Sequence, residues 1–444
     1  MINIDLDRLL FRLLCVYAFL VPFELVLEIF LGIDTIFKPY RVVCLALIVL
    51  YGFRVLRGGS LKLSRDFKED GLLYLVFLYG ILISLYNMIV AEFSLGKFYN
   101  EVFQTGLYLS IFVIVKGLPM TREQLQKLQK YLFWGLAVNG IYVVFSRYVI
   151  FTLGRQSGFF DNPNYLSLGM LYAIGYIAVN FERVKFSTKG LYLALIAICG
   201  MAFLIAGSRT GAVVMAANVL LILSFQSFRS ILISLTFLAV ISPVFFLSSD
   251  FGVTTRHNTI LEERLQDREL ADDPRFPIWE GVIRASQETH FIGLGLGQFE
   301  ARFPEFYKEE NNLLIYEILS YGYHLSPHSD YMAVLITYGI IGLVLFLLFF
   351  LVSIWKVLHY LWATSDRAIY RMQLLGLVTI IIFGIAAENF VSGLYWMILT
   401  LSTKSTYETG EALSTSKTKL QSKHEQTTGD RLIGLDRLGG RPLL

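Results

Sequence analysis

Apolar runs of around 20 residues recur along the 444-residue chain, and they constrain its fold more than any other feature. A helix of about 20 apolar residues crosses the roughly 30 Å hydrocarbon core of a bilayer. Inside that core, a helix satisfies the backbone N–H and C=O groups internally. A mean hydropathy of +0.59 and a charged fraction of 16% agree with this interpretation. The sequence therefore predicts an all-α polytopic membrane protein.

The candidate helices are unevenly spaced and divide the chain into four parts. Nine candidates fall within residues 1–248 and three within residues 331–401, the last of them short. We expect residues 249–330 to form a large helical loop with a function, because this connection is far longer than usual. Residues 402–444 are rich in Ser, Thr, Lys and Gly, which predicts a disordered cytoplasmic tail. The twelve candidates lie at 9–31, 36–56, 71–92, 99–117, 128–153, 163–181, 189–206, 210–226, 229–248, 331–355, 371–387 and 389–401.

The positions of Lys and Arg predict the orientation of these helices. Basic residues collect in the even-numbered connections, for example Arg54, Lys116, Arg183 and Lys356. Short cationic loops remain on the cytoplasmic side of the membrane. We therefore expect both termini inside, and every odd-numbered connection, including residues 249–330, on the outer side.

Arg209 interrupts a long apolar stretch, FLIAGSRTGAVVM at residues 203–215. An arginine at a helix centre costs about 2.5 to 3.5 kcal/mol on insertion scales, so such residues lie near a membrane surface or face a polar cavity. Snorkelling to the headgroups is the first alternative. Snorkelling does not explain the small residues beside Arg209, which favour tight helix packing or the close approach of a ligand.

The long outer connection contains three local patterns. ILEERLQDREL is polar with helical spacing, and RFPIWEGVIRASQ places Ile278, Trp279, Val282 and Ile283 on one face of a second helix. We expect two amphipathic helices that pack on the outer face of the membrane domain. GLGLGQF has the glycines of a tight turn. A nucleotide loop is the alternative, but the third glycine has the wrong spacing and no strand precedes the segment.

Conspicuous polar residues recur in separate odd-numbered connections, and the topology brings them to one face. Taken singly, an arginine at a helix end usually snorkels, and a lone loop histidine usually belongs to the surface. Their convergence favours a shared site. Its candidate members are Arg155, Asn162, Asn164, Arg209, Arg275, Trp279, His328 and Asp330.

These residue types suit one kind of chemistry. The arginine fork matches phosphate oxygens, so two arginines from different loops suit a pyrophosphate. Histidine takes a proton from a hydroxyl near neutral pH. Pro327 tends to break a helix, which places His328 beside the start of the tenth span and leaves His324 in the loop. The pattern predicts transfer from a phosphorylated lipid to an alcohol. No carboxylate and histidine cluster has metal-ligand spacing, so we expect no metal or cofactor.

The motifs resemble those of the bacterial O-antigen ligase and Wzy-type polymerase superfamily, which are membrane glycosyltransferases of the GT-C kind. The resemblance covers roughly residues 150 to 400. Ser329 departs from it, since Asn commonly follows the histidine. The motifs are R-x-S-G-x-x-x-N-P-N at Arg155 to Asn164, S-R-T-G at Ser208 to Gly211, R-x-x-x-W at Arg275 to Trp279, a G-x-G turn near Gly295, and H-S-x-Y then G-I-I-G at His328 to Gly342.

The resemblance implies metal-independent, inverting transfer of a glycan from undecaprenyl pyrophosphate to a sugar hydroxyl. The acceptor is lipid A core in the ligases and another lipid-linked glycan in the polymerases, and related members glycosylate protein. The family's essential arginines correspond to Arg209 and Arg275, and its essential histidine to His328. The implied location is the bacterial inner membrane with the active site facing the periplasm, among membrane lipids. No nucleic-acid partner is expected.

A secondary transporter or a flippase for lipid-linked glycans is the alternative from another functional class. Twelve helices with a few charges inside the membrane also fit such a protein. The two halves of the sequence show no evident repeat, and the polar residues collect at one surface instead of at mid-membrane. These two features favour the glycosyltransferase.

Overall fold

The structure is a computed structural model that describes residues 5–32, 38–57, 67–150, 155–225, 275–306, 326–364, 367–388, 390 and 392–406. Every regular element in this part of the chain is a helix, which confirms the all-α prediction. The fourteen helices lie at α1 (Leu6–Leu20), α2 (Val26–Leu31), α3 (Pro39–Leu56), α4 (Phe67–Val90), α5 (Leu95–Gly117), α6 (Arg122–Tyr148), α7 (Pro163–Asn180), α8 (Phe186–Ala206), α9 (Arg209–Phe225), α12 (Arg275–Glu288), α13 (Phe299–Phe306), α15 (Asp330–Ala363), α16 (Ala368–Phe383) and α17 (Gly393–Thr403).

Most candidate membrane spans coincide with a helix of the structure. Five described helices, α3, α4, α5, α8 and α15, are long and apolar enough to cross a membrane, and α9 and α16 are shorter apolar helices. The span predicted at 229–248 and the helix predicted at 260–270 lie outside the described residues. The chain is therefore a multi-pass membrane protein, and the count of twelve spans stays a prediction.

The first predicted span, 9–31, is divided in the structure. Helix α1 ends at Leu20, and the short helix α2 begins at Val26. Pro22 follows the end of α1, and its ring nitrogen has no hydrogen to donate to the helix. The residues between α1 and α2 therefore form a turn after α1.

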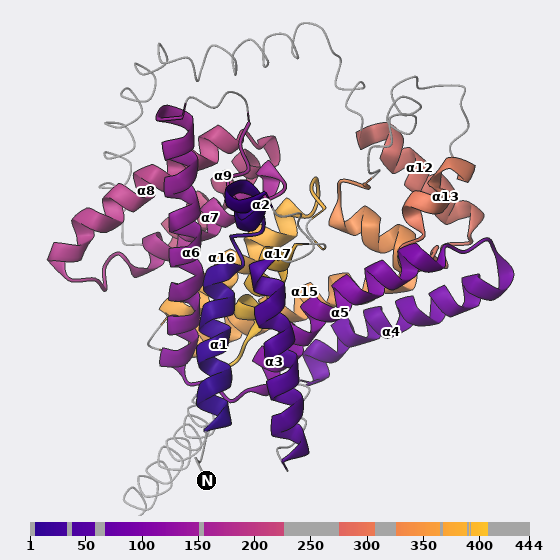
Figure 1. The fold of residues 1–444 in the computed structure, drawn as a ribbon, viewed down its shortest axis with the longest axis horizontal. Helices are drawn as coiled ribbons and strands as arrows, with labels where there is room; N and C mark the ends of the chain where they lie inside the picture. The colour runs from indigo at the N-terminus through magenta and orange to yellow at the C-terminus, as the bar shows by residue number, and fades with distance from the viewer. Residues whose placement is uncertain are drawn as a thin grey trace, which may run out of the picture.

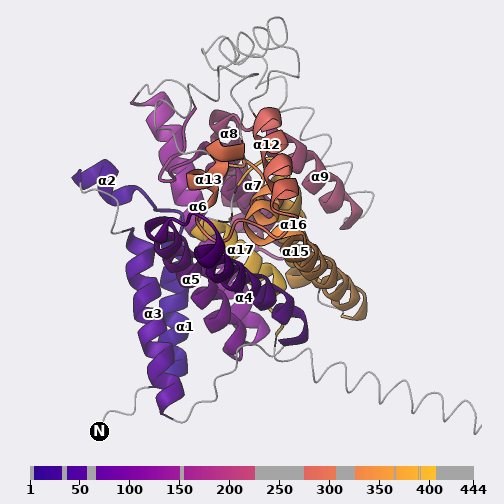
Figure 2. The same ribbon diagram turned by 90° about the vertical axis from the view of Figure 1, so that its right-hand side faces the viewer.

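Helices α7, α9, α15 and α17 pack against α16, and α8 packs against α6 and α7 (Figures 1 and 2). Helices α1, α3 and α6 run side by side, and α4, α5 and α15 form a second group that leans away from them. Every residue of α17 is buried, although the helix has only 11 residues. Helices α2, α12 and α13 lie at one end of the molecule and the N-terminus at the other.

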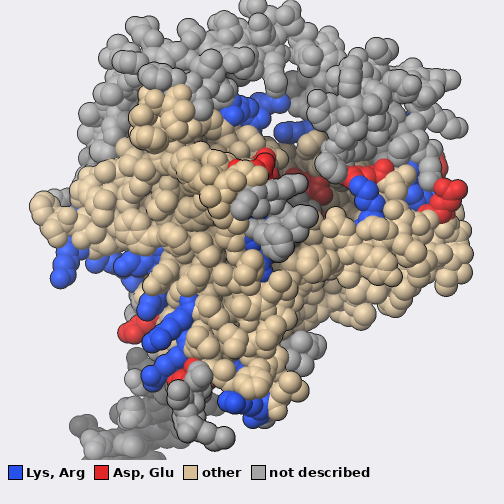
Figure 3. All heavy atoms as spheres, viewed as in Figure 1, with Lys and Arg blue, Asp and Glu red and all other residues tan. Residues whose placement is uncertain are grey.

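The surface of the described residues has the charge distribution of a membrane protein. Figure 3 shows a broad surface without charged side chains, with charged side chains gathered above and below it. Large apolar side chains are exposed on the helices, among them Leu56 at 86%, Ile89 at 83% and Phe186 at 89%. Such exposure is unfavourable in water and favourable in lipid.

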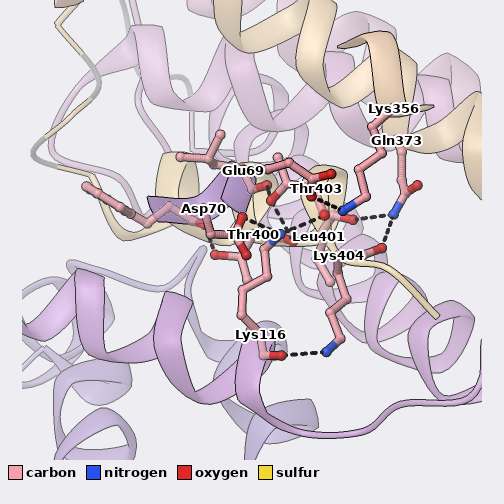
Figure 4. Close-up of polar contacts among 11 residues, drawn as sticks. Glu69, Asp70, Lys116, Lys356, Gln373, Thr400, Leu401, Thr403 and Lys404 are labelled. Carbon is pink, nitrogen blue, oxygen red and sulfur yellow. Dashed lines mark hydrogen bonds and ion pairs between the residues drawn. The ribbon is translucent and has the colours of Figure 1, made fainter. Parts of the chain in front are cut away.

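A buried lysine cluster joins α4, α5 and α17 at the end of the molecule predicted to be cytoplasmic (Figure 4). The Nζ of Lys116 lies 2.9 Å from Oδ1 of Asp70, and both side chains are 1% exposed. Lys116 also donates to the carbonyl of Thr403 at 2.6 Å. Lys404 donates in return to the carbonyls of Lys116 and Leu118. Each lysine thus satisfies carbonyls at the C-terminal end of the other's helix.

The packed core extends beyond residue 402, where the sequence predicts the start of the tail. Ser402, Thr403, Lys404 and Thr406 are all buried. These residues therefore belong to the packed core, although composition assigned the tail from residue 402 onward. Residues 407–444 lie outside the described part of the chain.

Breaking the buried ion pair should destabilise the protein strongly. Asp70→Ala leaves the Lys116 ammonium buried without its carboxylate, a change that costs about 3–5 kcal/mol. We expect a large fall in the melting temperature in detergent. Glu280→Ala is the control, because it removes the exposed i,i+4 pair with Arg284, worth at most about 1 kcal/mol. Equal melting temperatures for the two variants would contradict a structural role for Asp70.

Candidate functional site

Arg209 is the first residue of α9, directly after the turn that joins α8 to α9. Gly207 ends α8 in the left-handed conformation with φ 59°, and the hydroxyl of Ser208 accepts a hydrogen bond from the N–H of Gly211 at 3.1 Å. A Cβ on Gly211 would lie 2.8 Å from the ring of Phe203. The small residues beside Arg209 therefore make a tight helical hairpin, and they leave the Arg209 side chain exposed.

Arg155 and Asn164 lie against this hairpin. Nε of Arg155 donates to the carbonyl of Ala206, the last residue of α8, at 2.9 Å. A second nitrogen of Arg155 lies 3.4 Å from Oδ1 of Asn164. Asn162 caps α7 by accepting a hydrogen bond from the N–H of Asn164 at 2.8 Å. The R-x-S-G-x-x-x-N-P-N motif thus folds so that its first and last residues meet beside the Arg209 turn.

His328 lies in a second turn, residues 326–329, in front of α15. Its φ of 51° is in the left-handed region, and its N–H donates to the Ser326 hydroxyl at 3.1 Å. Ser329 caps α15. The indole N–H of Trp279 donates to the carbonyl of Pro327 at 2.8 Å, which fixes α12 to this turn. The His328 side chain is exposed beside α12.

Arg275 is the first residue of α12 and is half-buried. The buried face of this helix consists of Ile278, Val282 and Ala285. Ile283, which the sequence pattern placed on that face, is 43% exposed. The prediction for Ile283 was wrong because the packed stripe follows the spacing 278, 282 and 285 against α15.

Glu388 joins the two turns, and sequence reasoning missed it. Its carboxylate accepts a hydrogen bond from the Ser326 hydroxyl in the His328 turn. Its carbonyl accepts one from the Tyr165 hydroxyl, next to Asn164, at 3.1 Å. Burial raises the pKa of Glu388 to about 7, and the Ser326 hydrogen bond opposes this increase. A lone glutamate in the apolar segment AAENF is the same kind of signal that singled out Arg209.

Asp330 has an anchoring position in the structure. The N–H of Asp330 donates to the carbonyl of Gly384 at 2.8 Å. Its buried carboxylate accepts a hydrogen bond from the N–H of Phe390 at 3.1 Å. Asp330 therefore fixes the start of α15 to the segment that contains Glu388, directly beside the His328 turn.

The GLGLG segment, which follows α12, docks onto α15 and α4. Gly293, Gly295 and Gly297 all have positive φ, as does Gly339 at a kink inside α15. The N–H of Gly295 donates to the carbonyl of Thr337 at 3.0 Å, and the N–H of Ile340 donates to the carbonyl of Phe291 at 2.9 Å. The structure confirms a turn, and the G-I-I-G motif begins with the glycine that allows this contact.

Alanine at Gly295 should disrupt the docking of α12. Its Cβ would lie 2.9 Å from Cα of Ser84, and the backbone φ of +87° strains any L side chain. We expect Gly295→Ala to lower the amount of folded protein recovered after gel filtration. Gly200→Ala in α8 is the control, since its Cβ meets no atom within 4 Å. Normal recovery of the Gly295 variant would show that the docking tolerates a side chain.

These contacts join the Arg209 turn to the His328 turn through Tyr165 and Glu388, and we call the residues of the two turns, with Glu388 and with Arg275 and Trp279 of α12, the outer site. Arg155 and Asn164 lie at the Arg209 turn, Trp279 and Arg275 lie on the helix fixed to the His328 turn, and Glu388 contacts both sides. Arg209 and Arg275 each begin a helix, where backbone N–H groups and the helix dipole favour an anion.

Comparison with family models finds one match over part of the chain. Residues 193–347, about a third of the sequence, match the model described as O-antigen ligase. No curated protein matches the chain. The matched segment contains Arg209, Arg275 and His328, whereas Arg155, Asn164 and Glu388 lie outside it. The resemblance drawn from the motifs is confirmed.

Proposed function

We propose that this chain, whose residues 193–347 match the O-antigen ligase family model, transfers a glycan from undecaprenyl pyrophosphate to a sugar hydroxyl. The family supports a membrane glycosyltransferase of the ligase or polymerase type that acts on lipid-linked glycans. We further propose that the reaction occurs at the periplasmic face of the bacterial inner membrane. The acceptor is lipid A core or another lipid-linked glycan.

The observation that carries this proposal is that two arginines begin helices, and that the helix of one of them, α12, is fixed to the His328 turn through Trp279. Arg209 begins α9 and Arg275 begins α12. An arginine offers a permanent charge and a fork of donors, and a helix N-terminus adds backbone N–H groups aimed at an anion. Two such ends suit the two phosphates of a lipid pyrophosphate.

The reaction we propose is a single displacement. The oxygen of the acceptor hydroxyl forms a bond to the anomeric carbon of the donor glycan, and the bond from that carbon to the pyrophosphate oxygen breaks. The hydroxyl proton passes to His328, and undecaprenyl pyrophosphate leaves with the electron pair. Attack from the face opposite the leaving group inverts the anomeric configuration.

Arg209 and Arg275 stabilise the negative charge that develops on the leaving oxygen. Electrostatic stabilisation of this kind is usually the largest single contribution to catalysis. Arginine charge provides it here without a metal ion in the proposed step. Glu388 positions the base, because its carboxylate accepts the Ser326 hydroxyl and that hydroxyl in turn accepts the N–H of His328.

The ionisation of Glu388 gives a prediction for stability against pH. Its pKa of about 7 lies above the ordinary value of 4.5, so the fold favours the neutral carboxyl. That stabilisation is fully present below pH 4.5 and is lost as pH rises through about 7. Glu388→Gln keeps a neutral side chain, so its melting temperature should exceed that of the wild type increasingly from pH 5 to about pH 7 and by a constant amount above that pH. A constant difference between pH 5 and about pH 7 would contradict the pKa assignment.

The test of the proposed function is a transfer assay with the full chain in detergent. The donor is an undecaprenyl-pyrophosphate-linked glycan, and the acceptors are lipid A core and a second lipid-linked glycan in separate reactions. Mass spectrometry should show one acceptor enlarged by the donor glycan. A transporter or a flippase would leave both lipids chemically unchanged, and that outcome would overturn the proposal.

A further inference from the structure

A second polar cluster lies beside the outer site, in a part of the chain that the family match does not cover. We call Glu24, Lys38, Tyr40, Tyr108 and Asp161 the acidic cluster. Its members come from the turn after α1, the start of α3, the middle of α5 and the segment before α7. The proposed transfer uses none of these residues.

The acidic cluster has a definite geometry. Nζ of Lys38 lies 3.2 Å from a carboxylate oxygen of Asp161 and 3.8 Å from Oε2 of Glu24. The Tyr40 hydroxyl donates to Oε1 of Glu24 at 3.5 Å and lies 3.2 Å from the Tyr108 hydroxyl. The chain holds these segments together, since the N–H of Leu25 donates to the carbonyl of Phe159 at 2.8 Å.

Glu24 is the buried member of the cluster. It is 3% exposed, and its Oε2 accepts no hydrogen bond from the described residues. Burial raises the pKa of Glu24 to about 8, with the Asp161 carboxylate adding to the increase and Lys38 opposing it. A buried polar atom without a hydrogen bond is costly and needs an explanation.

Asp161 is the accessible member. Its side chain is 47% exposed, whereas that of Lys38 is 12% exposed. The shorter contact of Lys38 is with Asp161 and not with Glu24. Lys38 therefore lies between the exposed Asp161 carboxylate and the buried Glu24 carboxyl. The cluster offers both hydrogen-bond donors and acceptors to a polar ligand.

The acidic cluster and the outer site share one face of the molecule. Asp161 directly precedes Asn162, which caps α7 within the outer site. Tyr165 lies four residues after Asp161, and its hydroxyl donates to the carbonyl of Glu388 at 3.1 Å. The segment 161–165 therefore connects the acidic cluster to the outer site.

The charges of the two groups favour different ligands. The arginines at the N-termini of α9 and α12 attract a pyrophosphate, whereas the one cation of the acidic cluster, Lys38, is already paired with Asp161. Carboxylate, ammonium and phenol groups together match the alternating hydroxyls of a sugar, because each hydroxyl both donates and accepts a hydrogen bond. A transferase with two substrates needs two such distinct regions.

We propose that the acidic cluster is the binding subsite for the acceptor saccharide, with Asp161 and Lys38 contacting hydroxyls of its terminal sugar. Glu24 is a positioning residue that holds Lys38 from behind. The proposal rests on the proposed function and deepens it by assigning the acceptor to the N-terminal half of the chain. It requires an acceptor that presents sugar hydroxyls and carries no phosphate at this subsite.

The test measures the two substrates separately on the full chain in detergent. The probes are undecaprenyl pyrophosphate for the donor side, and oligosaccharide released by mild acid from the source cell's own surface polysaccharide for the acceptor side. Asp161→Ala should weaken oligosaccharide binding about tenfold or more, since it removes a hydrogen bond to a charged group. It should leave undecaprenyl pyrophosphate binding within about twofold of the wild type. Arg209→Ala should show the opposite pattern.

Three further variants separate binding from folding. Glu280→Ala removes an exposed carboxylate of α12 and should change neither affinity. In the transfer assay, Glu24→Ala should raise KM for the acceptor with little change in kcat, and Glu24→Gln should restore KM. A loss of stability alone would not raise KM while leaving kcat unchanged.

Several outcomes would overturn the subsite. They are no binding of the oligosaccharide by the wild type, unchanged oligosaccharide affinity in Asp161→Ala, or an equal loss of affinity for both probes in that variant. If Arg209→Ala and His328→Ala transferred glycan normally, the proposed function would fail instead, and the two failures are distinguishable because they affect different variants.

Discussion

Replacing His328 with alanine should lower glycan transfer by about 10²- to 10⁴-fold, the usual contribution of a general base. His328 is exposed in a turn that Ser326, Glu388 and Trp279 all hold in place. Its backbone contacts do not depend on the imidazole, so the variant should fold and accumulate normally. The measurement is the initial rate of transfer by the purified variant at saturating donor and acceptor.

The matched control for this variant is His324→Ala, four residues earlier in the sequence. We expect a mild effect there. Donor binding should survive in His328→Ala because both arginines remain. A His328 variant that transfers glycan near the parental rate would exclude proton transfer to this residue.

Replacing Arg209 with alanine should lower kcat by about 10²- to 10³-fold, the effect of removing one preorganised charge stabiliser. It should also weaken undecaprenyl pyrophosphate binding, because the same charge contacts the substrate before the bond breaks. The exposed position of Arg209 at the start of α9 means that its loss removes no core packing. The measurement is kcat, together with KM for the donor.

Arg284→Ala is the matched control, since Arg284 is an exposed arginine of α12 that pairs with Glu280. It should leave kcat and KM unchanged. If Arg209→Ala had parental kcat and donor affinity, Arg209 would be a snorkelling residue, the first alternative that its sequence context allows.

The parts of the fold that depend on local sequence could be predicted. Apolar runs located most helices, because the length of a membrane helix follows from bilayer thickness. Pro327 placed His328 before α15, and the structure has it there. The division of the first span at Pro22 and the burial of Ser402, Thr403, Lys404 and Thr406 were not predicted, because each depends on packing between helices distant in the sequence.

The candidate site was only partly predictable for the same reason. Conspicuous residues such as Arg209 and Arg275 are visible in an apolar context, but their partners are not. Nothing in the spacing of the sequence indicates that Arg155 reaches the carbonyl of Ala206, 51 positions later. Glu388 and Ser326 are separated by 62 positions, and only the folded chain brings them together.

The central claim is that the outer site breaks a glycan–pyrophosphate bond and forms a glycosidic bond in one step. The most direct measurement counts two products in the same reaction of the purified chain: free undecaprenyl pyrophosphate and glycan newly joined to the acceptor. The account predicts that they appear in a ratio of about one to one and that His328→Ala reduces both equally. Release of undecaprenyl pyrophosphate without new glycosidic bonds, or glycan movement with the donor intact, would contradict it.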